Sequence, residues 1–69
     1  MWFRVNFGYY TRENSISEHY VGRYGFVQAV SFDEAMKKAK AYFHKHPLRH
    51  LKIHSVIPVD FIPSCGILD

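Results

Sequence analysis

The chain has few of the residues from which disulfide, metal and catalytic sites are usually built. It has one cysteine among 69 residues, Cys65, so no intrachain disulfide can form and a zinc site of paired cysteines is excluded. Its four glycines are scattered, so a glycine-rich phosphate loop is also missing. No stretch is long and apolar enough to be a membrane span or the core of a secretory signal. We therefore expect a soluble, cytoplasmic protein without a cofactor.

Acidic residues are missing from one long part of the chain. Between Ala35 and Val59 there is no aspartate or glutamate, whereas the whole chain carries nine Lys/Arg against six Asp/Glu and a net charge of +3. A surface of one sign attracts partners of the other sign, either phosphates or carboxylate-rich protein faces. The basic residues of this stretch that we single out as partner-binding candidates are Lys37, Lys38, Lys40, Lys45 and Arg49.

One helix is predicted from Ser31 to His44. Ser31 is a favourable N-cap, and Glu34 follows three residues later, as in a capping box. Pro47 prevents the helix from continuing. Apolar residues recur at steps of three and four, which predicts one buried face. That face comprises Phe32, Ala35, Met36, Ala39, Tyr42 and Phe43.

Three strand-like stretches flank this helix. They cover Trp2–Tyr10, in which the odd-numbered side chains should face the helix, His19–Val30 and Leu51–Val59. The order strand, strand, helix, strand predicts an α+β fold, with one helix packed on a three-stranded, mainly antiparallel sheet. We expect a single domain over residues 1–60 and a C-terminal tail over residues 61–69.

Local irregularities are predicted in these strands. Gly22 and Gly25 indicate a bulge or bend in the second strand. A change of apolar parity predicts a bulge near Ser55 in the third strand, and Pro58 indicates that this strand ends there or lies at an edge. The polar residues 11–18 are predicted to form the loop between the first two strands.

The sheet face away from the helix is predicted to be aromatic and uncovered, with Tyr20, Tyr24 and Phe26 as partner-binding candidates. Aromatic and basic residues on an open sheet hold single-stranded nucleic acid in small domains. The helix lysines, however, should lie on the opposite layer. A rigid scaffold with such a face also suits a protein-binding adaptor or inhibitor, in which the first or third strand could offer an edge to a partner. A second copy of the chain is a further candidate partner.

No metal site or catalytic constellation is predicted. Four histidines lie close together in sequence, but Pro47 divides them into two pairs on different elements. Cys65 lies in the tail, where we expect no fixed geometry for a nucleophile. The chain is therefore predicted not to be an enzyme. The four histidines are His44, His46, His50 and His54.

Two segments carry a resemblance to a known family. Residues 29–35, Ala-Val-Ser-Phe-Asp-Glu-Ala, open the helix, and the pattern Ile53-x-x-Val56-x-Pro58 lies in the last strand. Together they resemble the small podovirus-type inhibitors of host RNA polymerase, whose helix begins Ala-Thr-Leu-Asp-Glu-Ala and whose last strand ends in Val-x-Pro. The likeness covers roughly residues 26–59. Small anti-CRISPR proteins with a helix on a sheet share the same helix-capping pattern.

The resemblance implies a phage-encoded, non-catalytic protein that binds and inhibits a host nucleic-acid-processing complex, either RNA polymerase or a CRISPR effector. One departure matters. The family carries two arginines around the valine of its binding strand, where this chain has Ser55 and Ile57. The contacts made by those arginines are therefore not transferred to this chain. Inhibition of such a complex is the leading expectation, and direct binding of single-stranded nucleic acid is the alternative.

Overall fold

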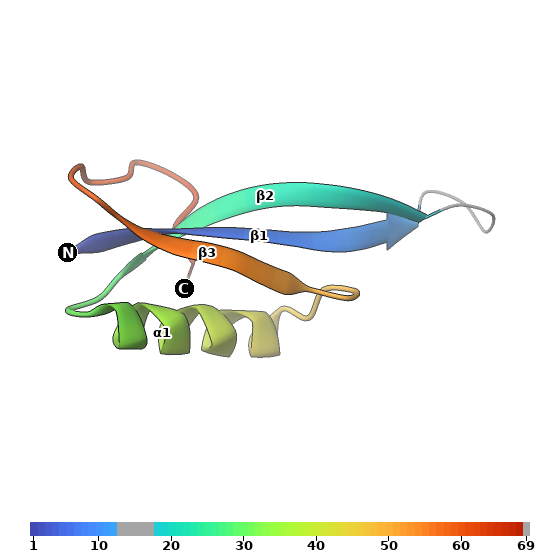
Figure 1. The fold of residues 1–69 in the computed structure, drawn as a ribbon, viewed down its shortest axis with the longest axis horizontal. Coiled ribbons are helices and arrows are strands. Elements are labelled where there is room, and N and C mark those ends of the chain that lie inside the picture. The colour runs from blue at the N-terminus through green and yellow to red at the C-terminus, as the bar shows by residue number, and fades with distance from the viewer. Residues whose placement is uncertain (13–17, 69) are drawn as a thin grey trace.

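The protein is a three-stranded sheet with one helix on one face (Figure 1). A computed structural model describes residues 1–12 and 18–68. Its sheet is antiparallel throughout, with strand order β2-β1-β3, so the predicted α+β fold is confirmed. No helix among the described residues has the length and apolarity needed to cross a membrane. The elements are β1 (Trp2–Arg12), β2 (Glu18–Gln28), α1 (Phe32–Lys45) and β3 (Lys52–Val59).

The first strand is the centre of the sheet, so the expectation that it could offer an edge is wrong. Both the hairpin partner β2 and the returning strand β3 pair with β1, which leaves β2 and β3 as the edges. The β1–β2 register runs without a shift from the Trp2–Gln28 pair to the Arg12–Glu18 pair. The bulge predicted at the glycines of β2 is therefore absent from this strand.

The predictions for β3 are confirmed. Its register with β1 shifts by one residue, because Asn6 pairs with Ser55 while Phe7 pairs with Ile53. His54 is the extra residue of this bulge. Pro58 lies in an edge strand, where its missing N–H does not interrupt a ladder on both sides.

The β1–β2 hairpin is longer than predicted and extends beyond the helix (Figure 1). Thr11, Arg12 and Glu18, which were expected in the loop, belong to the strands. The rest of the expected loop, residues 13–17, lies outside the described residues.

The helix begins and ends as its sequence predicts. The Glu34 backbone N–H donates to the Ser31 hydroxyl at 3.2 Å, and the His46 N–H closes the last turn on the Tyr42 carbonyl at 2.9 Å. The Glu34 carboxylate forms an i,i+4 ion pair with Lys38 at 3.3 Å.

The predicted apolar face of α1 is confirmed except at Phe32, which is half exposed. Ala35, Ala39 and Phe43 are buried at steps of four residues, and Met36 and Tyr42 are partly buried against the core. Small alanines allow the helix to approach the sheet closely along this single line. Phe32, in the first turn, lies outside the line, and its predicted burial is wrong.

The core lies between α1 and the odd-numbered side chains of β1, as predicted. Phe3, Val5 and Phe7 are all buried, and the Phe7 ring packs against the Phe43 ring with centroids 4.7 Å apart. The remaining strands contribute Val27 and Val56 from the two sides of β1.

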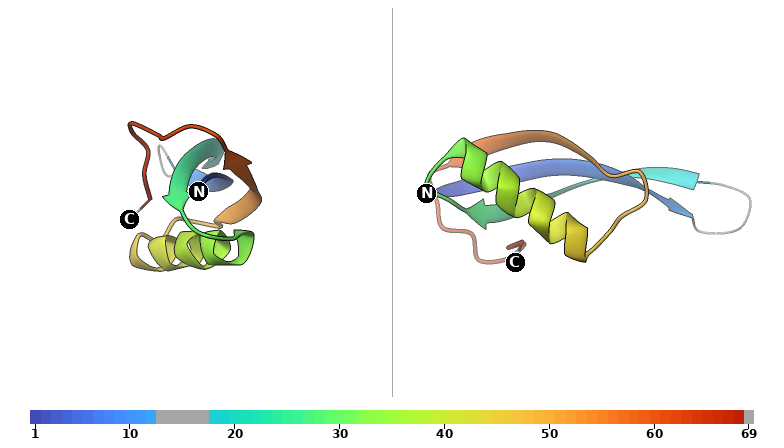
Figure 2. Two further views of the ribbon diagram at one scale, coloured as in Figure 1. Left: turned by 90° about the vertical axis from the view of Figure 1, so that its left-hand side faces the viewer. Right: turned by 90° about the horizontal axis from the view of Figure 1, so that it is seen from below.

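The segment after β3 folds back onto the sheet. It crosses the face opposite α1 at one end of the sheet and then descends beside β2 (Figures 1 and 2). There the Phe26 N–H donates to the Gly66 carbonyl and the Leu68 N–H donates to the Phe26 carbonyl, each at 2.8 Å. The Phe61 ring lies over Phe26, with centroids 5.6 Å apart, and Pro63 is buried.

Candidate functional site

The candidate site is the sheet face opposite α1, which we call the open face. Its side chains come from the even-numbered residues of β1 and β2, because successive strand residues alternate between the two faces. Beyond the C-terminal segment this face carries three tyrosine rings that remain accessible. Tyr10 is 38% exposed, Tyr20 is 47% exposed and Tyr24 is 60% exposed.

One half of the open face combines an aromatic ring with a fixed cation. The Arg4 guanidinium lies over the Tyr24 ring, 5.1 Å from its centroid. Arg4 Nε donates to Asn6 Oδ1 at 3.0 Å, and Asn6 Nδ2 donates to Ser55 Oγ at 2.9 Å. This chain of hydrogen bonds across β1 and β3 holds the guanidinium in place beside the tyrosine.

The other half is a cluster of two tyrosines and two histidines. The Tyr10 ring meets the Tyr20 ring edge to face at 5.3 Å and the His50 ring at 5.7 Å. The Tyr20 hydroxyl is hydrogen-bonded to His54 Nε2. Gly8 lies beneath this contact, and a Cβ there would collide with the Tyr20 hydroxyl and approach His54 Nε2 to 2.9 Å. Absence of a side chain at Gly8 is therefore what lets this cluster form.

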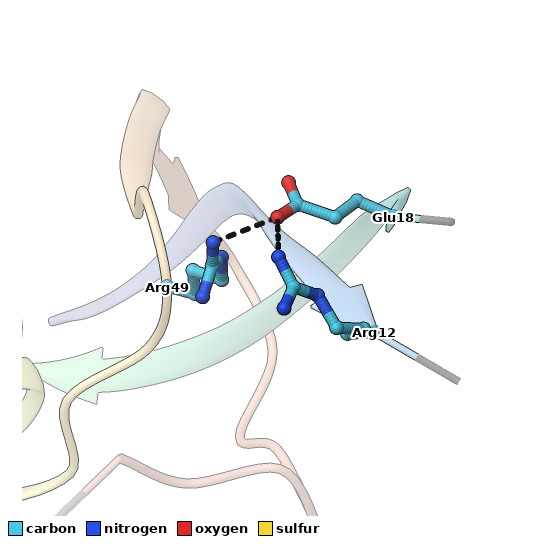
Figure 3. A network of polar contacts seen from close by, with 3 residues as sticks. All are labelled: Arg12, Glu18 and Arg49. Carbon is cyan, nitrogen blue, oxygen red and sulfur yellow. Dashed lines mark hydrogen bonds and ion pairs between the residues drawn. The ribbon is translucent and has the colours of Figure 1, made fainter. Parts of the chain in front are cut away.

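An ion-pair network closes the far end of the open face (Figure 3). Glu18 Oε1 accepts from Arg12 at 2.8 Å and from Arg49 at 2.7 Å. The hydrogen bond from Arg12 and the charge of Arg49 lower the pKa of the Glu18 carboxyl, although desolvation of the carboxylate opposes them. One carboxylate thus faces two guanidinium groups, and the network keeps a net positive charge.

The structure separates the predicted partner-binding residues instead of gathering them. Arg49 lies in the Glu18 network, and Tyr20 and Tyr24 lie on the open face. Lys38 is held by Glu34 and by the Gln28 carbonyl, at 2.6 Å from the latter. The helix lysines, which lie on the other layer of the molecule, are Lys37, Lys38, Lys40 and Lys45.

Phe26 is not an exposed aromatic residue, which corrects the sequence expectation. Its strand position does place it on the open face, in the same cross-strand row as Arg4. The C-terminal segment then covers it, so that only 7% of its surface remains accessible. Arg4 was not singled out from the sequence, although alternation along β1 places it on the same face as Tyr10.

The four histidines considered as metal ligands fall into two separate groups. His50 and His54 contact the tyrosines of the open face, whereas His44 and His46 lie at the end of α1, where the His46 ring is 4.6 Å from the Tyr42 ring. Within the described residues, no three histidine, cysteine or carboxylate groups lie close enough to hold a metal ion.

A groove of about 350 Å³ lies between α1, the start of the sheet and the C-terminal segment. Its lining has neither histidine, cysteine nor carboxylate, and of its two lysines Lys38 is already hydrogen-bonded. Apolar side chains and lysine stems suit packing more than chemistry. The lining residues are Trp2, Gln28, Lys38, Ala41, Tyr42, Lys45, Ile67 and Leu68.

Comparison with protein-family models, with curated protein sequences and with solved structures gives no match for this chain. Function is therefore inferred from the chemistry of the surface itself.

Proposed function

We propose that the protein is a non-catalytic binding module that holds single-stranded nucleic acid on the open face of its sheet. One observation carries the proposal: three accessible tyrosine rings and a guanidinium held by hydrogen bonds share one face of the sheet. A base stacked on an aromatic side chain contributes about 1–3 kcal/mol without sequence preference. Tyr20 and Tyr24 are four residues apart on β2, about 13 Å along the strand, so a short oligonucleotide can reach both.

The charges of the open face support the same ligand. The Arg4 guanidinium lies over the Tyr24 ring. Lys52 pairs with Gly8 of β1, so its side chain shares the open face. Glu18 is opposed by two arginines and does not leave an uncompensated negative charge there. Phosphate contacts can therefore form beside the stacking rings, without any help from the lysines of α1.

The test is a fluorescence-anisotropy titration of the protein with labelled oligothymidylate and oligouridylate. Tyr24→Ala and Tyr20→Ala should each weaken binding by about tenfold, since each removes a stacking platform. Lys37→Ala and Lys40→Ala, on the other layer, serve as matched controls and should change affinity little. Affinity should also fall as salt rises, because bound phosphates release counterions. Absence of binding at low salt, or equal affinity in the tyrosine variants, would overturn the proposal.

A second candidate is inhibition of a host nucleic-acid-processing complex, as the sequence resemblance implies. The observation that favours it is the basic outer side of α1, where Lys37, Lys40 and Lys45 follow Glu34 with no further acid on the helix. On this second proposal the lysines face an acidic surface of RNA polymerase or of a CRISPR effector. The site of action would be the cytoplasm, that of the host cell if a phage encodes the protein.

The two candidates separate in a pull-down from bacterial lysate, with half of the lysate treated with nuclease. A stoichiometric protein complex that survives nuclease supports the inhibitor, and its retention should be lost in the Lys37→Glu, Lys40→Glu double variant. Recovery that disappears with nuclease and depends on Tyr24 supports nucleic-acid binding. Full retention of the complex by the double variant would overturn the role of the helix lysines.

A further inference from the structure

The two edges of the sheet are protected against strand addition to different degrees. The β3 edge has a bulge at His54 and a proline at position 58, both of which discourage further pairing. The β2 edge has neither, because its eleven residues follow β1 without a register shift and include no proline. A long, regular edge strand of this kind is a template for another strand.

The direction of the backbone groups on β2 follows from Phe26. Its N–H and its C=O both bond to the C-terminal segment, so they point away from β1. Because these directions alternate along a strand, the other even-numbered residues of β2 point outward as well. Before Phe26 they are Glu18, Tyr20, Gly22 and Tyr24, and after it Gln28, whose carbonyl accepts from Lys38. Among the described residues, the hydrogen bond found on the outward backbone groups of the first four is the one from Arg23 Nη1 to the Gly22 carbonyl, at 3.2 Å and exposed.

We propose that β2 pairs with β2 of a second copy of this chain, antiparallel and centred on Val21. In this register Glu18 pairs with Tyr24 of the second copy and Tyr20 pairs with Gly22, so all four outward residues of each copy are used. Phe26 is left out, as its own edge position is already occupied by Gly66 and Leu68. Four pairs that each exchange two bonds give about eight new hydrogen bonds across the interface.

The geometry of this pairing decides what the dimer looks like. Antiparallel strands in one sheet are related by a twofold axis perpendicular to the sheet, so both helices lie on one side and both open faces on the other. A sheet of about six strands results. A register centred on Gly22 instead would place Glu18 opposite Phe26 of the other copy, in the position held by the C-terminal segment. Because the C-terminal segment occupies the edge at Phe26, it both selects the register and limits the length of the strand pairing.

Cysteine cross-linking tests the register. At the twofold axis the two Val21 residues form a non-hydrogen-bonded pair with Cα atoms about 4.5 Å apart, which is within disulfide range. In a Cys65→Ser background, Val21→Cys should form a covalent dimer under mild oxidation, whereas Ile57→Cys on β3 should not. His19→Cys and Arg23→Cys should cross-link with each other when mixed and neither with itself. A cross-link between mixed Val21→Cys and Arg23→Cys, with none for Val21→Cys alone, would overturn the Val21-centred register.

Light scattering after size-exclusion chromatography tests the dimer without any cross-link. The mass should rise with concentration from 8.1 kDa towards twice that value. Gly22→Pro removes an outward N–H that makes no bond to β1, so it should keep the wild-type circular dichroism while remaining a monomer. Gly22→Ala retains the N–H and enters open space, so it should dimerise like the wild type.

A wild-type protein that stays monomeric at every concentration, or a Gly22→Pro variant that still dimerises, would overturn the proposal. If Gly22→Pro disturbs folding, the cysteine variants still decide, because they leave every backbone N–H in place. No nucleic acid enters either experiment, so a failure here is distinguishable from a failure of the proposed nucleic-acid binding.

Discussion

At the scale of single residues, the packing of helix on sheet depends on Ala39, which is fully buried. Ala39→Asp would place a carboxylate in the core without a partner, and we expect a loss of more than about 3 kcal/mol in the free energy of unfolding. For a domain this small, such a loss abolishes the folded state. Ala41→Asp, at an exposed position two residues later, is the matched control and should remain folded. Urea denaturation monitored by circular dichroism measures both; a cooperatively folded Ala39→Asp would mean that the buried line of α1 is misassigned.

Gly8 and Gly22 face each other across β1 and β2 but tolerate substitution differently. A Cβ at Gly8 collides with the Tyr20 hydroxyl, whereas a Cβ at Gly22 meets nothing within 4 Å. Gly8→Ala should therefore displace Tyr20 from His54 and cost about 1 kcal/mol, while Gly22→Ala should not destabilise the fold. Proton NMR shifts of the Tyr20 ring, together with thermal unfolding, compare the two. An unchanged Tyr20 environment in Gly8→Ala would contradict the role of this glycine.

Glu18 makes stability depend on pH at the far end of the hairpin. Its pKa is lower in the folded protein than the usual 4.5, first through the hydrogen bond from Arg12 and then through the charge of Arg49. The ionised form therefore stabilises the fold above the pKa of the unfolded chain, and this contribution is lost as the pH falls through the lower, folded-state pKa. The melting temperature of Glu18→Gln should lie below that of the wild type at neutral pH and approach it in acid. If the difference in melting temperature stays constant with pH, the ionisation of Glu18 is not coupled to folding.

At the scale of elements, the helix and the strands could be predicted because their signals are local. The cap at Ser31, the stop at Pro47 and the bulge near Ser55 all depend on neighbours in sequence. Gly25 was predicted to mark a bulge or bend, but the contact at this position is with a residue remote in sequence. A Cβ at Gly25 would meet the Leu68 side chain, with Leu68 Cδ2 at 2.6 Å. No local pattern reveals a contact between residues 43 positions apart.

The C-terminal segment is the element whose contribution the sequence least reveals. Removal of residues 65–69 deletes the two hydrogen bonds to Phe26 and uncovers the core edge beside Leu68. We expect this truncation to lower the free energy of unfolding by about 2–3 kcal/mol. Ile62→Ala, in the same segment but 81% exposed, should cost little and is the control. Equal urea midpoints for the truncated and intact chains would show that the segment does not stabilise the fold.

At the scale of the whole molecule, the sequence could not determine which residues meet across strands. Alternation along each strand correctly placed Tyr20, Tyr24 and Phe26 on the open face. Whether β3 returns beside β1 or beside β2 is decided by packing between distant residues. Because β3 pairs with β1, β2 is left as an edge strand that has neither a bulge nor a proline. The strand order also brings His54 and Ser55 of β3 to the open face, which enlarges the candidate site beyond the residues of the hairpin.

The molecule is elongated, 43 Å by 20 Å by 17 Å, because the hairpin extends beyond the helix that covers its other end (Figure 1). Amides of Gly25 and Val27 lie over the core, whereas His19, which pairs with Thr11, lies nearer the end of the hairpin. A two-stranded ribbon without a packed layer opens more easily. Hydrogen exchange of the dilute protein should therefore be at least about tenfold faster at His19 than at Val27. On concentration, the outward amides of Tyr20 and Gly22 should gain protection if strand pairing occurs. Uniform protection along β2 in the dilute protein would mean that the end of the hairpin does not depend on α1 for its stability.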